Sequence, residues 1–156
     1  MIKTNVMRLL EHAHIPYRAL EYDVDEDNLA GEYVASQIGM PPEQVFKTLV
    51  AKGDKTGVLV FCIPVALELD FKKAASVTGN KKIEMLHVKD LLATTGYIRG
   101  GCSPIGMKKK YSTYMDETAI LFDEITVSAG VKGCQLCIPQ EALVEYIDAN
   151  ICDIAK

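Results

Sequence analysis

The chain has 156 residues, of which 49% are hydrophobic and 24% charged, a composition typical of a globular protein and not of a collagenous, coiled-coil or disordered chain. Its 17 basic and 21 acidic side chains give a net charge of −4, which argues against a protein that coats nucleic acid through bulk positive charge. The longest apolar runs, such as residues 58–65, are far shorter than the ~20 residues of a membrane span. We therefore expect a single domain over residues 1–156, with neither DNA nor a membrane as its partner.

In the first half of the chain, capping residues and glycines mark the ends of the expected elements. We expect a helix over 4–14 with Thr4 as its N-cap, a short strand over 17–21, an acidic loop over 23–28 and a helix over 31–38 that ends at Gly39. Strands over 45–52 and 58–63 flank a glycine-bounded turn, which predicts a hairpin. Asp70 is the expected N-cap of a helix that ends near Gly79.

The second half combines short strands with one glycine-rich loop. We expect a strand over 83–86, a helix over 88–94 closed by Gly96, a glycine-rich loop over 97–107, strands over 119–122, 125–128 and 134–138, and a helix over 139–149. Helices and strands are mixed without strict βαβ alternation. The pattern therefore predicts an α+β fold with a mixed, mostly antiparallel, barrel-like sheet flanked by helices.

The net charge conceals a segregated pattern. Residues 1–45 carry 3 basic and 8 acidic side chains (−5), residues 46–113 carry 12 and 5 (+7), and residues 114–156 carry 2 and 8 (−6). A domain with segregated charge can present a basic face to an anionic partner. The alternative is a set of solvated surface lysines with no partner.

The N-terminal segment and the cysteines indicate a cytoplasmic location. Residues 1–16 have helical spacing and lack the apolar core and cleavage site of a signal peptide. The five cysteines are odd in number and irregularly spaced, so reduced thiols are expected. Cys134 and Cys137 form a C-x-x-C, but they fall in an expected strand, face opposite sides and have no second ligand pair nearby. We expect neither a metal nor another cofactor.

Lys47 is the first candidate functional residue. It lies in an expected strand whose two faces are otherwise mostly apolar. A lysine in that position reaches water, pairs with an acid or lines a pocket, because lysines are seldom buried without a partner. It is equally consistent with an edge-strand lysine that opposes aggregation.

A glycine-rich turn over residues 100–106 is the second candidate. Three glycines and a proline in seven residues shape a turn whose main-chain N–H groups can approach a carboxylate, a phosphate or a developing oxyanion. Arg99 precedes it, and Lys108, Lys109 and Lys110 follow, so the turn suits a substrate that bears phosphate. It matches neither a Walker loop nor G-x-G-x-x-G.

A second small-residue turn, over residues 128–133, is the third candidate. Ser128 can donate a hydrogen bond to a ligand, although a plain hairpin loop explains the turn nearly as well. No G-x-S-x-G, H-E-x-x-H or paired carboxylates are present, and no histidine is close to the glycine turns in sequence. Cys102 is a candidate thiol nucleophile, but the sequence provides only Lys47 or a distant histidine as the base that would activate it.

Five stretches of the chain match one known family in order and spacing: VFKTLV (45–50), ELDFKKAA (68–75), KKIEML (81–86), TGYIRGGCSPIGMKKK (95–110) and ITVSAGVKG (125–133). The glycine-serine-proline turn with its trailing lysines is the most specific of them. With these stretches the chain resembles, over nearly its whole length, the YbaK-type family of free-standing bacterial aminoacyl-tRNA editing proteins, the Cys-tRNA(Pro) deacylases. The domain of that family is shared with the editing insertion of prolyl-tRNA synthetases.

The resemblance implies hydrolysis of mischarged Cys-tRNA(Pro), with the substrate's own thiol attacking its ester carbonyl to give a cyclic thiolactone. It implies catalytic positions at Lys47, Gly101 and Ser128. We expect the Gly101 N–H to contact the oxyanion or carbonyl and Ser128 to position the amino or ribose end of the substrate. Lys47 would contact the terminal phosphate or ribose and would not act as a base. Gln135 stands near a position where some members carry an acidic residue.

The remaining implied contacts involve the tRNA. Tyr22 is similar to the family's pocket tyrosine, and Arg99 would lie close to the substrate. Lys108, Lys109 and Lys110 would hold the acceptor stem by charge, independently of sequence. The partners implied are the acceptor end of aminoacyl-tRNA and, as a further candidate, prolyl-tRNA synthetase. Three alternatives remain at this stage: an Ala-tRNA(Pro) deacylase, a non-catalytic tRNA- or synthetase-binding module, and a thiol enzyme that uses Cys102.

Overall fold

The computed structural model describes residues 2–156, in which short helices surround two small sheets. Two helices begin at their predicted N-caps. The Thr4 side chain accepts a hydrogen bond from the Met7 N–H, and the Asp70 side chain accepts one from the Lys73 N–H. The helices are α1 (Asn5–His12), α2 (Gly31–Ile38), α3 (Phe71–Thr78), α4 (Val88–Thr95) and α5 (Gln140–Tyr146), with 3-10 turns η1 (Pro42–Gln44) and η2 (Glu117–Leu121).

The strands form one five-stranded and one three-stranded sheet. The first has the order β4-β2-β3-β5-β8 and the second the order β1-β7-β6. Pairing is antiparallel except for β3–β5 and β5–β8. The strands are β1 (Arg18–Glu21), β2 (Phe46–Gly53), β3 (Gly57–Pro64), β4 (Ile83–Met85), β5 (Ser112–Asp116), β6 (Glu124–Ser128), β7 (Cys134–Pro139) and β8 (Asn150–Cys152). The predicted α+β class with mixed, mostly antiparallel pairing is confirmed, and within residues 2–156 neither sheet closes into a barrel.

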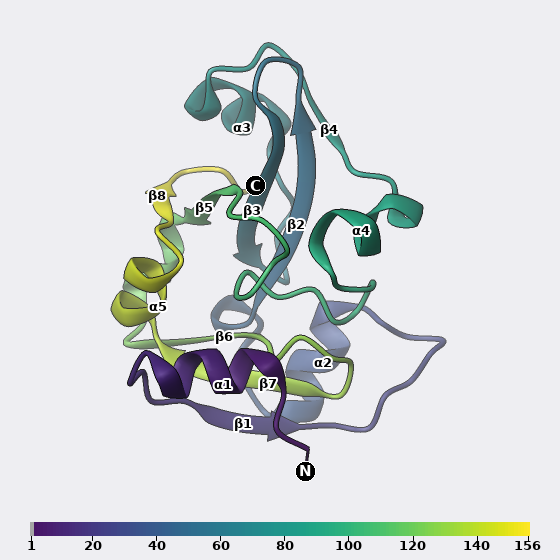
Figure 1. Ribbon diagram of the computed structural model, residues 1–156, viewed down its shortest axis with the longest axis vertical. Coiled ribbons are helices and arrows are strands. Elements are labelled where there is room, and N and C mark those ends of the chain that lie inside the picture. The colour runs from purple at the N-terminus through teal and green to yellow at the C-terminus, as the bar shows by residue number, and fades with distance from the viewer. Residues whose placement is uncertain (1) are drawn as a thin grey trace.

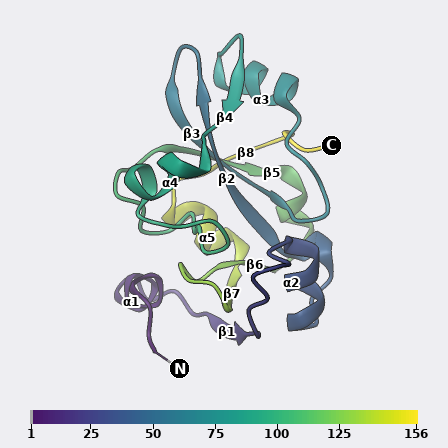
Figure 2. The ribbon, with the colours of Figure 1, turned by 90° about the vertical axis from the view of Figure 1, so that its right-hand side faces the viewer.

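The two sheets meet where β2 begins. Val45 forms a single parallel bridge with Thr126, and the Gln44 side chain donates to the Glu124 carbonyl oxygen at 2.8 Å. In Figure 1 the β2–β3 hairpin extends from this junction toward α3, while α1 lies alongside the three-stranded sheet. Figure 2 shows α2 and α4 on either side of β2. One apolar core lies around the junction with α1 and α5, and a second lies under α3.

The C-terminal third differs from the sequence-based expectation in three places. Residues 119–122, expected to be a strand, lie mostly in the 3-10 turn η2, which the Asp116 side chain caps through the Thr118 N–H. The last helix ends at Tyr146, not Ala149, because Asp148 adopts a φ of 54° and the chain turns into β8. Strands β5 and β8 were not expected. They pair in parallel with residues distant in sequence, so no local turn signal marks them.

None of the helices within residues 2–156 has the length and the apolar character needed to cross a membrane.

Candidate active site

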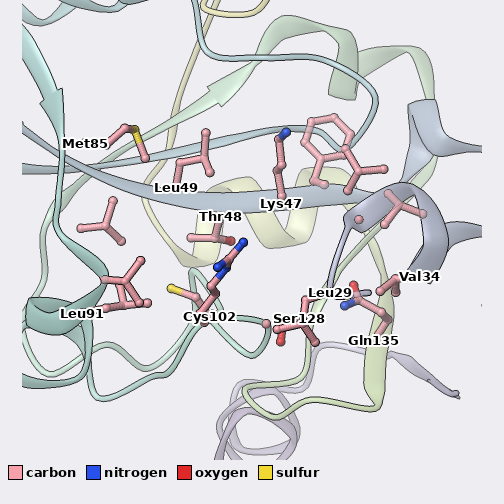
Figure 3. Close-up of a pocket in the computed structure, with 18 of the residues that line it drawn as sticks. Leu29, Val34, Lys47, Thr48, Leu49, Met85, Leu91, Cys102, Ser128 and Gln135 are labelled. Atoms are coloured by element: carbon pink, nitrogen blue, oxygen red, sulfur yellow. The ribbon is translucent and has the colours of Figure 1, made fainter. Parts of the chain in front are cut away.

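A cavity of about 570 Å³ lies against β2, close to the junction of the two sheets. Its walls come from α2, α4, the turn at residues 99–102 and the facing ends of β6 and β7 (Figure 3). The volume falls in the range of small-molecule binding sites. Four of the predicted site residues, Tyr22, Lys47, Arg99 and Ser128, line this one cavity although they are far apart in sequence.

Lys47 is half-buried at the cavity wall. Figure 3 shows its side chain on the same side of β2 as Leu49, whereas Thr48 points the other way, toward Cys102 and Ser128. Burial lowers the pKa of the Lys47 ammonium below its ordinary value, and the charges of Glu68 and Glu32 oppose that shift. Lys47 is therefore placed to attract an anion at the cavity but is separated by the strand from Ser128.

Ser128 and Gln135 are neighbours on the opposite wall. They are paired residues in the β6–β7 ladder, so their side chains project from the same face of the sheet. The Ser128 Oγ accepts a hydrogen bond from the Gly130 N–H at 3.1 Å, which leaves the hydroxyl proton available as a donor. The Gln135 Oε1 is buried and has no hydrogen-bond partner within residues 2–156. Gln135 lines the cavity, so a ligand donor that reaches this covered oxygen would satisfy it.

Gly101 does not present its N–H to the cavity. Its N–H donates to the Ile98 carbonyl oxygen at 3.0 Å, so the N–H is not available to a substrate oxygen in this structure. Its neighbours Gly100 and Cys102 line the cavity, and Gly101 does not. A Cβ at position 101 would lie 3.1 Å from the Val131 carbonyl carbon, so glycine is needed for close packing of the two turns.

Lys132, in the second turn, contacts both the acidic loop and the glycine-rich turn beside the cavity. Its Nζ lies 2.9 Å from the Glu26 carboxylate, which links the second turn to the acidic loop. Its methylene groups pass over Gly100, where an added Cβ would lie 3.4 Å from the side chain. Because Gly100 and Tyr22 both line the cavity, this ion pair connects two segments that shape it.

Cys102 lines the cavity as a neutral thiol. Burial raises its pKa to about 12, and the hydrogen bond with the Thr95 side chain offsets this only in part. Among the residues that the structure describes, no histidine lines the cavity. A thiol with this pKa and without an adjacent base is a poor nucleophile at neutral pH.

The three consecutive lysines do not converge on this cavity. Lys109 and Lys110 line a separate hollow of about 290 Å³ behind the glycine turn, together with Tyr111 and Tyr146. Lys110 lies 3.4 Å from Asp148 in an exposed ion pair. The Lys108 N–H donates to the Thr95 carbonyl oxygen at 3.1 Å at the end of α4. Their expected contact with the acceptor stem stays a prediction about the outer surface.

The cysteine pair in β7 shows no sign of a shared site. Cys137 is buried, and its Sγ accepts a hydrogen bond from the Arg18 guanidinium at 3.3 Å. Cys134 belongs to the apolar core near α1. Within residues 2–156, no disulfide bond joins any of the five cysteines. Within residues 2–156, no group of three His, Cys, Asp or Glu side chains is placed to hold a metal ion.

Thr48 and Lys132 were not singled out by the sequence analysis. In the sequence Thr48 is an ordinary strand residue. Nothing in the sequence indicates that the neighbouring strand β4 ends before it reaches Thr48. Lys132 lies in the same turn as Ser128, and its acidic partner, Glu26, is 106 residues away. A charge pair at such separation has no local sequence signal.

Comparison with known proteins identifies the family of this chain. A family model described as "Aminoacyl-tRNA editing domain" matches residues 29–146. An Enterococcus faecalis protein named "Putative Cys-tRNA(Pro)/Cys-tRNA(Cys) deacylase EbsC" is 50% identical over 97% of this chain and 93% of its own length. A proline–tRNA ligase of Thermosipho africanus is 30% identical over 50% of this chain and 14% of its own length.

The fold agrees with a solved structure. The crystal structure described as that of a putative trans-editing enzyme for prolyl tRNA synthetase superposes with a TM-score of 0.84 over 100% of this chain and 99% of its own, at 21% identity. The two chains thus share the α+β fold. This chain belongs to the aminoacyl-tRNA editing domain family, as the sequence motifs had indicated.

Proposed function

We propose that this protein is a trans-editing deacylase that hydrolyses the ester bond of Cys-tRNA(Pro), with residues 1–156 acting as one domain. Membership of the editing family and the 50% identical relative support the proposal. The observation that carries it is chemical. The cavity offers hydrogen-bonding groups and cations, yet among the described residues its one thiol is neutral and no histidine lies beside it. Such a site suits a substrate that supplies its own nucleophile.

In the proposed reaction, the thiol of the esterified cysteine attacks its own ester carbonyl carbon. The carbon–sulfur bond forms as the bond to the ribose oxygen breaks, giving a cyclic thiolactone, and the thiol proton passes through water to the ribose oxygen of the released tRNA. Water then opens the thiolactone to free cysteine. An ordinary thiol is already a few per cent ionised at pH 7, so the protein contributes orientation and no base.

The residues around the cavity divide this task. The Ser128 hydroxyl donates to the oxygen of the free ribose hydroxyl, whose proton is accepted by the Gln135 Oε1. The Arg99 guanidinium pairs with the phosphate of the terminal nucleotide. Lys47 adds positive charge from its own side of β2, near the same phosphate or ribose. Tyr22 lines the same cavity.

A deacylation assay with three substrates tests the proposal. Purified protein is incubated with Cys-tRNA(Pro), Ala-tRNA(Pro) and Ser-tRNA(Pro), which differ only in the side chain of the ester. We expect rapid loss of the cysteinyl ester and at least tenfold slower loss of the other two. Cleavage of the seryl ester at the cysteinyl rate would rule out attack by the substrate thiol. Preference for the alanyl ester would assign the protein to Ala-tRNA(Pro) instead.

The non-catalytic alternative gives a different result in the same experiment. A binding module would retain tRNA, with an affinity that falls steeply with salt, and release no amino acid above the buffer rate. Prolyl-tRNA synthetase is the proposed protein partner, a proposal supported by the partial similarity to a proline–tRNA ligase. Co-sedimentation of the two proteins with and without tRNA tests that association.

A further inference from the structure

The cavity lies against the edge of β2, not against one of its faces. Five consecutive residues of the strand, 46–50, line it. Successive side chains of a strand point to opposite faces, so a cavity against one face would be lined by alternate residues only. A run without gaps means that the cavity adjoins the main chain itself along one edge of the strand (Figure 3).

Two hydrogen bonds establish which main-chain groups face that edge. The Val50 carbonyl oxygen accepts from the Leu86 N–H at 3.0 Å, so Val50 faces the β4 edge. The Val45 carbonyl oxygen accepts from the Val65 N–H at 2.8 Å, so Val45 faces β3. Because the direction alternates along a strand, the N–H and C=O of Thr48 point to the same edge as Val50. Within residues 2–156 neither group has a hydrogen-bond partner.

The open stretch of this edge is short. Strand β4 pairs with β2 only from Ala51 to Gly53, and Val45 is bridged to Thr126 at the other end. Five residue steps at about 3.3 Å each separate Val45 from Val50, a gap of roughly 16 Å that is closed at both ends. An extended peptide longer than about four residues would collide with the bounding segments, whereas a single aminoacyl residue fits within the gap.

We propose that the main chain of Thr48 binds the aminoacyl group of the substrate as if it were a single residue of an added strand. The substrate α-ammonium donates to the Thr48 carbonyl oxygen, and its ester carbonyl oxygen accepts from the Thr48 N–H. An aminoacyl ester has the same N–Cα–C=O unit as a strand residue, so both bonds of an antiparallel pair form together. The identity of the ligand depends on the proposed function, and the binding mode depends on the edge alone.

This binding mode determines where the substrate side chain goes. Opposed residues of an antiparallel pair place their side chains on the same face, so the cysteinyl side chain lies on the Thr48 side of β2. Figure 3 shows that Thr48 points toward Cys102 there. A D-aminoacyl group making the same two bonds would direct its side chain away from the Thr48 side, into the position of the L-residue's Hα. The main-chain contact therefore selects L-aminoacyl esters. The Thr48 N–H also donates to the ester carbonyl oxygen, a role for which the Gly101 N–H is not available.

Amide exchange in the full chain tests the inference directly. The probe is adenosine with L-cysteine joined to the 3′-position through a non-hydrolysable amide. At saturation we expect exchange of the Thr48 amide proton with solvent to slow at least tenfold. The amides of Lys47 and Leu49 face β3 and are internal controls that should not change. Saturation that leaves the exchange of Thr48 unchanged would overturn the inference.

Two further measurements add support that does not depend on exchange. A 3-mercaptopropionyl probe, which lacks the amino group, should bind at least fivefold more weakly, the effect of one lost hydrogen bond. The D-cysteinyl probe should also bind at least fivefold more weakly, because its side chain no longer lies on the Thr48 side of β2. Thr48→Pro removes the N–H without breaking the ladder to β3 and should weaken L-probe binding at least fivefold; circular dichroism checks its fold. Equal binding of the L- and D-probes contradicts the inference. No binding of any probe, together with no deacylation, overturns the proposed function itself.

Discussion

Gln135 lies directly across the β6–β7 ladder from Ser128, and the two side chains face the same cavity with opposite hydrogen-bonding states. The Ser128 Oγ is already held by the Gly130 N–H, whereas the Gln135 Oε1 is buried without a partner in the described chain. A buried unpaired amide oxygen costs stability unless a ligand satisfies it. The pair therefore combines an oriented donor, the Ser128 hydroxyl, with an unpaired acceptor, the Gln135 Oε1. A single ribose hydroxyl, which both accepts and donates, would bind both groups.

The first prediction concerns Gln135→Leu. We expect the free enzyme to be as stable as the original or more stable, by up to about 2 kcal/mol, because an unsatisfied buried amide is removed. We expect kcat/KM for Cys-tRNA(Pro) to fall about tenfold, because the ribose hydroxyl loses its acceptor. Thermal unfolding and deacylation rates measure the two effects. On a substrate that lacks the free ribose hydroxyl, the substitution should have little further effect.

Gln140→Leu is the matched control. Gln140 is also buried with an unpaired Oε1, but it lies at the start of α5 and outside the cavity. It should reproduce the change in stability and leave deacylation as it was. If the two variants lose activity equally, the loss is structural and the assignment of Gln135 to the substrate is wrong.

Gly101→Ala is expected to lower activity by misplacing the turns. Gly101 does not adopt a positive φ, so alanine is conformationally allowed there. Its Cβ would meet main-chain atoms of Val131 and Lys132 at 3.1–3.2 Å, and backbone cannot yield as a flexible side chain does. We expect a loss of about 1–3 kcal/mol in the free energy of unfolding and a clear loss of kcat/KM.

The control for Gly101 is Gly57→Ala. Gly57 has a φ of 77° with open space around it, and it lies in the distant hairpin turn. Alanine there should cost roughly 1 kcal/mol through backbone strain alone, with normal activity. Chemical denaturation and deacylation measured on both variants separate a general loss of stability from a specific loss at the cavity. Full activity in Gly101→Ala would show that the close contact of the turns is not needed.

Much of the fold could be predicted because its signals are local. The β2–β3 hairpin has a glycine-bounded turn, and α3 has Asp70 and Gly79 at its ends. Strands β5 and β8 could not be predicted, because each is defined by a parallel pairing with a strand distant in sequence. A short stretch such as β5 carries no turn signal of its own.

The candidate site was predictable in its residues and less so in its geometry. Lys47, Arg99 and Ser128 do reach one cavity, which the family motifs indicated. Lys109 was expected at the acceptor stem; it lines a separate hollow, and its contact with the stem stays a prediction. The Gly101 N–H and the open edge at Thr48 depend on individual main-chain hydrogen bonds, and side-chain patterns do not encode these.

The Glu26–Lys132 ion pair gives a prediction that separates charge from packing. The pair is partly exposed, so its loss should change stability by less than about 1 kcal/mol. Lys132→Met keeps the methylene contact with Gly100 and removes the charge, whereas Lys132→Ala removes both. We expect the alanine variant to raise KM severalfold and the methionine variant to raise it less. Equal KM values for the two variants would show that packing over Gly100 has no role.

Cys102 leads to the last prediction, which concerns pH. Its pKa is raised from about 9 to about 12 by burial, so the folded state favours the neutral thiol. The stability due to this preference is fully present below pH 9 and is lost as the pH rises from about 9 to about 12, because the unfolded thiol ionises first. Cys102→Ala should therefore lose stability less steeply than the original protein over that interval, as measured by urea unfolding at pH 8, 9 and 10.

The same variant distinguishes the two sources of a thiol in the reaction. If the substrate thiol attacks the ester, Cys102→Ala should lower kcat by less than tenfold, through altered packing at the cavity wall. The rate should still rise with pH as the substrate thiol ionises near pH 8.5. An enzyme nucleophile gives the opposite pattern, since its removal costs several orders of magnitude in kcat. A loss of that size, with the cysteinyl and seryl esters affected alike, would place the attacking sulfur on the protein.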